Sequence, residues 1–176
     1  PTPVVAPLLS KDTDGLPRKH TWKYRTLTGM LGYLQGTSRP EIAMAVHQCA
    51  RFNNDPKLSH ERAIKRICKY LLDTAEKGLI YKPDLSRGIE CYVDADFAGG
   101  WASGDNSNPE SVLSRTGFVL MYAGCPIYWC SKLQTEIALS TTEAEYIALS
   151  HSMREVLPFM NLIKEIREVF SFPQFK

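Results

Sequence analysis

Two short stretches of the sequence each place two acids one residue apart in an apolar setting. Residues 88–100 read GIECYVDADFAGG, and residues 140–148 read STTEAEYIA. A carboxylate directed toward a protein core is costly to bury unless it is paired, protonated or bound to a metal ion. These stretches are therefore candidates for a catalytic or metal-binding site, and the elements that carry them decide which acids point inward.

The second stretch opens a predicted helix over residues 141–170. A helix turns about 100° per residue, so Glu143 and Glu145 point roughly 200° apart and cannot serve the same site. Ser140 and Glu143 occupy the first and last positions of a capping box, which assigns Glu143 to structure. Glu145 falls within the apolar arc of the helix. Glu145 is therefore the candidate functional acid of this helix.

The first stretch has the period of two that is typical of a strand, and Asp94 lies near the end of this strand. If Asp94 faces Glu145, the two carboxylates form a negative cluster that a hard cation, Mg²⁺ or Mn²⁺, would stabilise through oxygen ligands. Asp96 shares the strand parity of Asp94 and is the second choice as a metal ligand. Alternatively, Asp94 forms a turn and Glu145 reaches solvent through a groove, and the pattern alone does not choose between these interpretations.

Other chemistry has less support. The four histidines have no metal-binding spacing, and the five scattered cysteines include no CxxC, so neither a zinc site nor a disulfide framework is predicted. The isolated glycines match no phosphate-binding fingerprint. His151 lies on the long predicted helix, and we interpret it as a partly buried packing residue.

The first half of the chain is predicted to be helical and basic. Residues 1–22 contain four prolines and no regular period, which predicts an extended lead-in whose ordering would require a partner. Helical spacing follows, with a break at GTSRP, a second helix from Pro40 and a third capped by Ser59. The third helix carries four cations that could lie along nucleic-acid phosphates or face solvent: Arg62, Lys65, Arg66 and Lys69.

The second half changes to strands. TGFVLMYAG and CPIYWCSKLQ are rich in aromatic and β-branched residues, and their junction at Ala123-Gly124 predicts a hairpin. Residues 99–114 are rich in Gly, Ser and Asn and predict an exposed loop. Pro158 is expected to kink the long helix that follows.

Charge is divided between the two halves of the chain. Residues 1–88 hold 15 Lys and Arg against 8 Asp and Glu, whereas residues 89–176 hold 6 against 11. This split fits a basic half that binds a polyanion and an acidic half that holds a cation-dependent site. Two ordinary solvated surfaces would give the same counts. No apolar run is long enough for a membrane span and no signal peptide is recognisable, so we expect an intracellular protein, cytoplasmic or nuclear.

Several of these segments together resemble the C-terminal region of the Pol polyprotein of Ty1/copia-type LTR retrotransposons. The resemblance covers residues 23–170 and is carried by YRTLTGMLGYLQGTSRPEIAMAV, HERAIKRICKYLLDTAEKGLIY, CYVDADFAG and SRTGFVLMYAGCPIYWCSKLQTEIALSTTEAEYIALS. It implies three regions: a lead-in over residues 1–22, a helical reverse transcriptase connection over 23–86, and the N-terminal part of a ribonuclease H domain over 87–176.

The resemblance implies a mixed α/β (α+β) fold: a three-stranded antiparallel sheet with a long covering helix, truncated at its C-terminal side. It also implies hydrolysis of the RNA strand of an RNA–DNA hybrid by two Mg²⁺ ions that four acids hold. Asp94 and Glu145 match the family's first two acids, so the helical geometry and the resemblance single out the same glutamate. No counterpart of the other two acids is found, so we expect little or no nuclease activity from this chain alone.

A different class of function stays open. The chain could be a retroelement-derived fragment that no longer catalyses and serves as a structural or binding subunit. A truncated sheet exposes an edge, a liability that pairing or covering relieves. We therefore expect the rest of the Pol polyprotein, or another protein chain, to cover the sheet.

Overall fold

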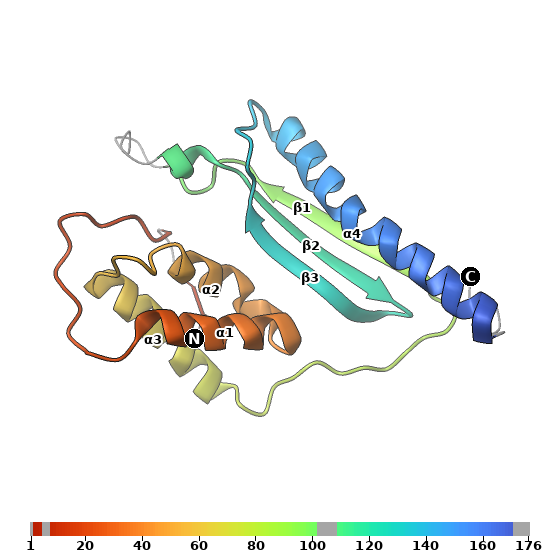
Figure 1. Ribbon diagram of the computed structural model, residues 1–176, viewed down its shortest axis with the longest axis horizontal. Helices are drawn as coiled ribbons and strands as arrows, with labels where there is room; N and C mark the ends of the chain where they lie inside the picture. Colours follow the sequence, from red (N-terminus) through yellow and green to blue (C-terminus); the bar gives the residue numbers. More distant parts are fainter. Residues whose placement is uncertain (1, 5–7, 102–108, 171–176) are drawn as a thin grey trace. The chain divides into compact units, whose positions relative to one another are not determined.

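The computed structural model describes residues 2–4, 8–101 and 109–170. The chain forms two compact units, Pro1–Leu79 and Ile80–Lys176, and each is described by itself. The first unit is helical and the second contains the sheet (Figure 1). The order of elements therefore agrees with the predicted change from helices to strands.

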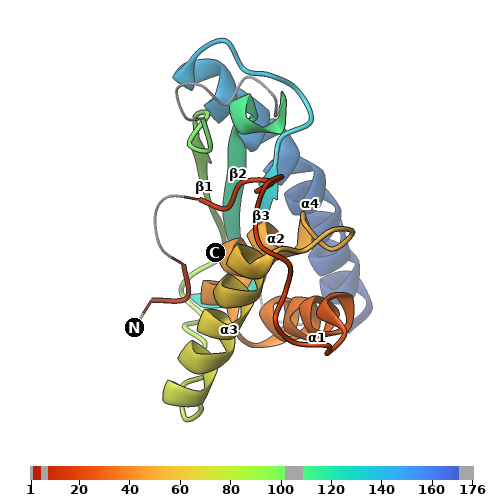
Figure 2. The same cartoon turned by 90° about the vertical axis from the view of Figure 1, so that its left-hand side faces the viewer.

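The helical unit contains three α-helices and a short 3-10 turn: α1 (Tyr24–Thr37), η1 (Pro40–Ile42), α2 (Ala43–Ala50) and α3 (Leu58–Asp73). Figure 2 shows α1, α2 and α3 packed together. Their apolar sides form one core that includes Leu31, Ile42 and Ile64, each at most 4% exposed. The hydroxyl of Tyr24 donates to the carbonyl of Cys49 at 3.1 Å, which fixes the start of α1 against the end of α2.

The α3 helix begins two residues earlier than expected, so the prediction of Ser59 as its N-cap was wrong. Lys57 is the cap residue, and its backbone N–H donates to Nδ1 of His60 at 2.9 Å. The Ser59 hydroxyl instead donates to Asp12, in the lead-in. The imidazole at the third helical position thus satisfies the backbone N–H of the cap residue, the role that a glutamate or glutamine has in a capping box.

The lead-in is extended, but the chain itself supplies the contacts that hold it. The Leu58 N–H donates to the Leu16 carbonyl at 2.9 Å, and Nε2 of the fully buried His60 lies 2.8 Å from the Ser10 carbonyl. An extended segment can be ordered by backbone hydrogen bonds to a neighbouring helix start, which composition does not reveal. The expectation that ordering requires a partner therefore does not hold for residues 8–22.

The second unit is built on an antiparallel sheet in the order β1-β2-β3, with β1 at Ile89–Asp96, β2 at Arg115–Tyr122 and β3 at Cys125–Leu133. A short 3-10 turn, η2 (Pro109–Val112), precedes β2. The predicted hairpin is confirmed: both turn residues have positive φ, 51° at Ala123 and 74° at Gly124, as a two-residue hairpin turn requires. Of the predicted exposed loop, residues 102–108 lie outside the described residues.

The long helix α4 (Thr141–Phe170) packs over β1 and β2 and is continuous through Pro158 (Figure 1). Ala144 and Ala148 are fully buried, and they pack with Val93 and Ala95 of β1. Their small side chains allow the helix to lie close to the sheet. Among the described helices, none combines the length and apolar character needed to cross a bilayer.

Candidate functional site

Asp94 is exposed on β1, where it pairs with Gly117 of β2. Its neighbours Val93 and Ala95 pack against α4. Because successive strand residues point to opposite faces, Asp94 and Asp96 are directed away from the face that α4 covers. In the described sheet β1 pairs with β2 alone, so its other edge is open beside α4.

Asp96 is the last residue of β1 and borders the turn that follows. A Cβ on Gly99 would overlap the Asp96 carboxylate, so this carboxylate folds back over the glycine. The turn also contains Ala98 with a positive φ of 48°. The Asp96 carboxylate thus lies against the turn after β1, and its role as a metal ligand stays a prediction.

Glu145 is half-buried in the first turns of α4. The most buried line of this helix is Ala144, Ala148, Ser152 and Val156, and Glu145 lies at the edge of that line. The sequence predicted Glu145 in the middle of the apolar arc, whereas the structure places it at the edge of the buried line. A half-buried carboxylate keeps access to solvent, and therefore to an ion.

The described residues contain no group of three or more His, Cys, Asp or Glu side chains placed to hold a metal ion. The three predicted ligands, Asp94, Asp96 and Glu145, therefore do not form one cluster of that size. At most two of these three carboxylates could share one ion. Carboxylate oxygens are ligands that suit Mg²⁺ and Mn²⁺.

Glu143 has the capping role that the sequence predicted. Its backbone N–H donates to the Ser140 hydroxyl at 3.1 Å, and its carboxylate accepts from the Leu139 N–H at 2.7 Å. The carboxylate thus reaches one residue beyond the cap. Both bonds satisfy backbone N–H groups at the helix start, so Glu143 is unavailable as a partner of Glu145.

The predicted basic face of α3 is divided by its contacts. Lys65 forms an ion pair with Glu61 at 2.8 Å. Arg66 borders a small apolar pocket beside Val4 and Leu9. Arg62 and Lys69 are exposed, and no ion pair within the described residues engages them. If α3 contacts phosphates, Arg62, Arg66 and Lys69 can do so without first breaking an ion pair, whereas Lys65 would have to leave Glu61.

Glu61 is a buried acid that the sequence analysis did not single out. It is 1% exposed and accepts from the backbone N–H groups of Lys19 and His20 at 3.1 and 3.2 Å. Hydrogen bonds from Lys65 and His20 lower the pKa of its carboxyl to about 2. Glu61 lies one turn before Ile64 on the apolar side of α3, the same signal that pointed to Glu145.

The sheet and the helix across it define a class of fold. A three-stranded antiparallel sheet with a long covering helix is consistent with a fragment of a ribonuclease H-like fold. The helical unit precedes the sheet, Asp94 lies on the first strand, and Glu145 lies on the covering helix. This order is the one that the resemblance implies.

Comparisons with known proteins give the relatives. The chain is 33% identical over 144 residues to the retrovirus-related Pol polyprotein from transposon RE1 of Arabidopsis thaliana, covering 82% of this chain and 9% of that protein. It is 37% identical over 145 residues to the corresponding polyprotein from transposon TNT 1-94 of Nicotiana tabacum, covering 81% and 10%. It is also 35% identical over 134 residues to secreted RxLR effector protein 161 of Plasmopara viticola, covering 76% and 89%.

The chain therefore belongs to the retrovirus-related Pol polyproteins of copia-type transposons. It spans about a tenth of the length of the two Pol relatives described above. Neither the family models nor the solved structures contain a match.

Proposed function

We propose that this segment of Pol contributes to metal-dependent hydrolysis of RNA in RNA–DNA hybrids, with Asp94 and Glu145 as Mg²⁺ or Mn²⁺ ligands. The observation that carries the proposal is a half-buried glutamate at the start of the helix that packs on β1, in a chain of the Pol family. Because Asp94 is directed away from the face that α4 covers, the two carboxylates would share an ion only around the open edge of β1. The other ligands of a two-metal site would come from Pol sequence outside this chain.

Mg²⁺ titration followed by ¹⁵N NMR tests this ligand pair. We expect amide signals around Asp94 and Glu145 to shift with Mg²⁺, and Asp94→Asn or Glu145→Gln to abolish the shift, because each substitution removes a charged oxygen ligand. Glu143→Gln is the matched control, since a glutamine at this position still caps the helix and Glu143 points away from Glu145. Unchanged titration in both site variants would refute the metal site.

The nuclease activity itself is tested with a labelled hybrid. We expect these 176 residues to cleave it weakly or not at all, because the described part of the chain holds no cluster of three metal-binding side chains. Rapid Mg²⁺-dependent turnover by the isolated protein would contradict this expectation.

Whether or not the chain catalyses hydrolysis, we propose that the protein acts in the cytoplasm or nucleus.

A second candidate is a retroelement-derived protein that acts by binding and not by catalysis. The observation in its favour is the relative named as an effector protein, which this chain matches over 89% of that protein's length. A binding protein would be indifferent to Asp94→Asn and would be recovered in stoichiometric complex with a partner chain. The Mg²⁺ titration therefore separates the two candidates.

A further inference from the structure

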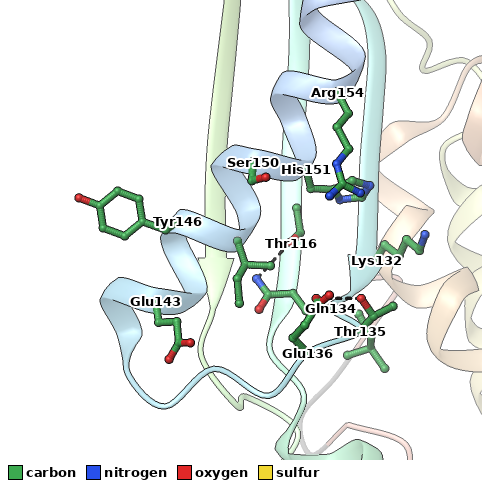
Figure 3. Close-up of a pocket in the computed structure, with 12 residues that line it drawn as sticks. Thr116, Lys132, Gln134, Thr135, Glu136, Glu143, Tyr146, Ser150, His151 and Arg154 are labelled. Atoms are coloured by element: carbon green, nitrogen blue, oxygen red, sulfur yellow. Dashed lines mark hydrogen bonds between the residues drawn. The ribbon is translucent and has the colours of Figure 1, made fainter.

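A cavity of about 410 Å³ lies within the sheet unit, between α4 and the chain that leaves β3 (Figure 3). Its volume is in the range of small-ligand pockets. Thr116 and Lys132 from the sheet contribute to it, and Thr135 and Glu136 come from the segment after β3. α4 contributes Glu143, Tyr146, Ile147, Ser150, His151 and Arg154.

The cavity is separate from the candidate metal site. A helix turns about 100° per residue, so four of the α4 residues that line the cavity point roughly 140° to 240° away from Glu145: Ile147, Ser150, His151 and Arg154. The body of the helix therefore stands between Glu145 and this cavity. A ligand in the cavity would not be a ligand of the Asp94 and Glu145 ion.

The floor of the cavity is held in place by buried hydrogen bonds. Gln134 is 5% exposed, and its Nε2 donates to the Thr116 hydroxyl at 3.2 Å and to the Ala144 carbonyl at 2.9 Å. These bonds tie β2 to α4 directly beneath the cavity. The His151 ring packs edge-on against Phe118 at 5.9 Å, which fixes the wall. The cavity is thus formed by ordered elements before any ligand arrives.

Two cations from different elements gather at this cavity. Figure 3 shows Lys132 and Arg154 on the same side, with His151 beside the Arg154 side chain. In the described residues neither Lys132 nor Arg154 forms an ion pair. Residues 89–176 contain only six Lys and Arg, so two of the six line one cavity in an otherwise acidic half. Such an arrangement attracts an anion.

Two acids, Glu136 and Glu143, also line the cavity, and in the described residues neither forms an ion pair with Lys132 or Arg154. Glu143 lies on the opposite side of the cavity in Figure 3, and its carboxylate is engaged in the helix cap. The Glu136 carboxylate accepts from the Thr135 hydroxyl at 2.8 Å. The Ser150 hydroxyl also lines the cavity and is an additional neutral donor. Lys132, Arg154 and Ser150 are thus donors at the cavity, and Gln134, which also lines it, has a buried Oε1 that no hydrogen bond engages in the described residues.

We propose that this cavity binds a phosphate group of a nucleic-acid strand, held by Lys132 and Arg154 with Ser150 as a further donor. The planar guanidinium of an arginine matches two phosphate oxygens, and a lysine adds a point charge from a second direction. The choice of phosphate rests on the cavity, whereas the choice of a nucleic-acid strand as its source rests on the proposed function. The site would hold a strand at a place distinct from the metal-binding acids.

The test is a titration of the full chain with a short single-stranded thymidine oligonucleotide in EDTA, followed by ¹⁵N NMR. EDTA removes divalent ions, so the result does not depend on Asp94 and Glu145. We expect shifts at Lys132, Gln134, His151 and Arg154, and at least about tenfold weaker binding for Lys132→Ala/Arg154→Ala. The salt slope of log Kd should fall by about 0.7, because one phosphate is no longer neutralised by these two cations.

The matched control is Arg25→Ala/Lys164→Ala, which removes one exposed arginine and one exposed lysine that do not line the cavity. It should bind as the unchanged protein does. Equal weakening in both double variants, or absence of shifts at the cavity, would overturn the proposal. Inorganic phosphate or an acidic peptide could also shift these signals. If either bound as tightly as the oligonucleotide, the assignment to a nucleic-acid strand would be overturned.

Discussion

Glu61 and Glu145 are both carboxylates on the inner side of a helix, yet their surroundings differ. Glu61 is 1% exposed and is surrounded by donors from Lys19, His20 and Lys65, with Arg18 3.9 Å away. Glu145 is half-buried and has solvent on one side. A buried charge that is fully paired serves structure, whereas one that keeps an open side can accept a ligand.

Replacement of Glu61 should therefore weaken the helical unit. We expect Glu61→Gln to reduce the free energy of unfolding by about 1–3 kcal/mol, because the amide cannot form the charge-assisted bonds that hold the lead-in. Urea denaturation followed by circular dichroism measures this change. Glu76→Gln, an exposed glutamate just after α3, is the control and should change stability by less than about 0.5 kcal/mol.

The pH dependence of stability follows from the same residue. The pKa of Glu61 is lowered from 4.5 to about 2, so the folded state favours the charged form. Its stabilising contribution is complete above pH 4.5 and is lost as the pH falls toward 2, and the Glu61→Gln protein should lack this part of the acid dependence. Parallel acid unfolding curves for the two proteins would contradict the assignment.

At the scale of elements, the β2–β3 hairpin depends on backbone conformation at its turn. Gly124 has a φ of 74°, and a Cβ at this position would lie 3.2 Å from the Arg87 guanidinium. The turn also binds the segment before β1, since the Asp84 N–H donates to the Ala123 carbonyl at 2.8 Å. One glycine thus supports both the hairpin and the entry to the sheet.

Two glycine substitutions should have opposite effects. We expect Gly124→Ala to destabilise the protein by about 1 kcal/mol, because alanine is strained at positive φ. Gly29→Ala, in the middle of α1 with no atom within 4 Å of its Cβ, should instead stabilise it by about 0.5–1 kcal/mol. Thermal denaturation of both variants checks the pair, and a stabilising Gly124→Ala would contradict the turn assignment.

At the scale of the molecule, the sheet unit exposes an apolar stripe along α4. Leu149, Met153, Leu157 and Met160 follow each other at helical spacing and are 47%, 38%, 51% and 47% exposed. In the described sheet, β1 also has an unpaired edge. Exposed apolar surface of this kind normally lies under another segment or chain, which agrees with a chain that spans about a tenth of its Pol relatives.

We expect this stripe to cause self-association when the segment is isolated. Leu149→Lys/Leu157→Lys should weaken association by about tenfold or more, because burying a leucine contributes about 1.5–3 kcal/mol. Sedimentation velocity over a range of concentrations measures it. Leu72→Lys is the control, since Leu72 is 78% exposed on α3 and not part of the stripe. A monomeric wild-type protein at all concentrations would contradict the expectation.

Local pattern was sufficient for most of the elements. Helical spacing located α1, α2 and α3, strand alternation located β1, and Ala123-Gly124 located the hairpin, because these signals depend on residues close in sequence. The capping role of Glu143 is local for the same reason. The sequence also placed Glu145 on the inner arc of its helix and Asp94 on the first strand, and their joint role as metal ligands stays a prediction.

The sequence by itself thus determined the family, the order of elements and the helical face on which Glu145 lies. Only the tertiary structure decided that the lead-in is held by Glu61 and His60, and that Lys132 and Arg154 border one cavity. Those partners are 22 to 50 residues apart, so no periodicity relates them. Contacts of this kind arise from the crossing of packed elements, which a local pattern does not encode.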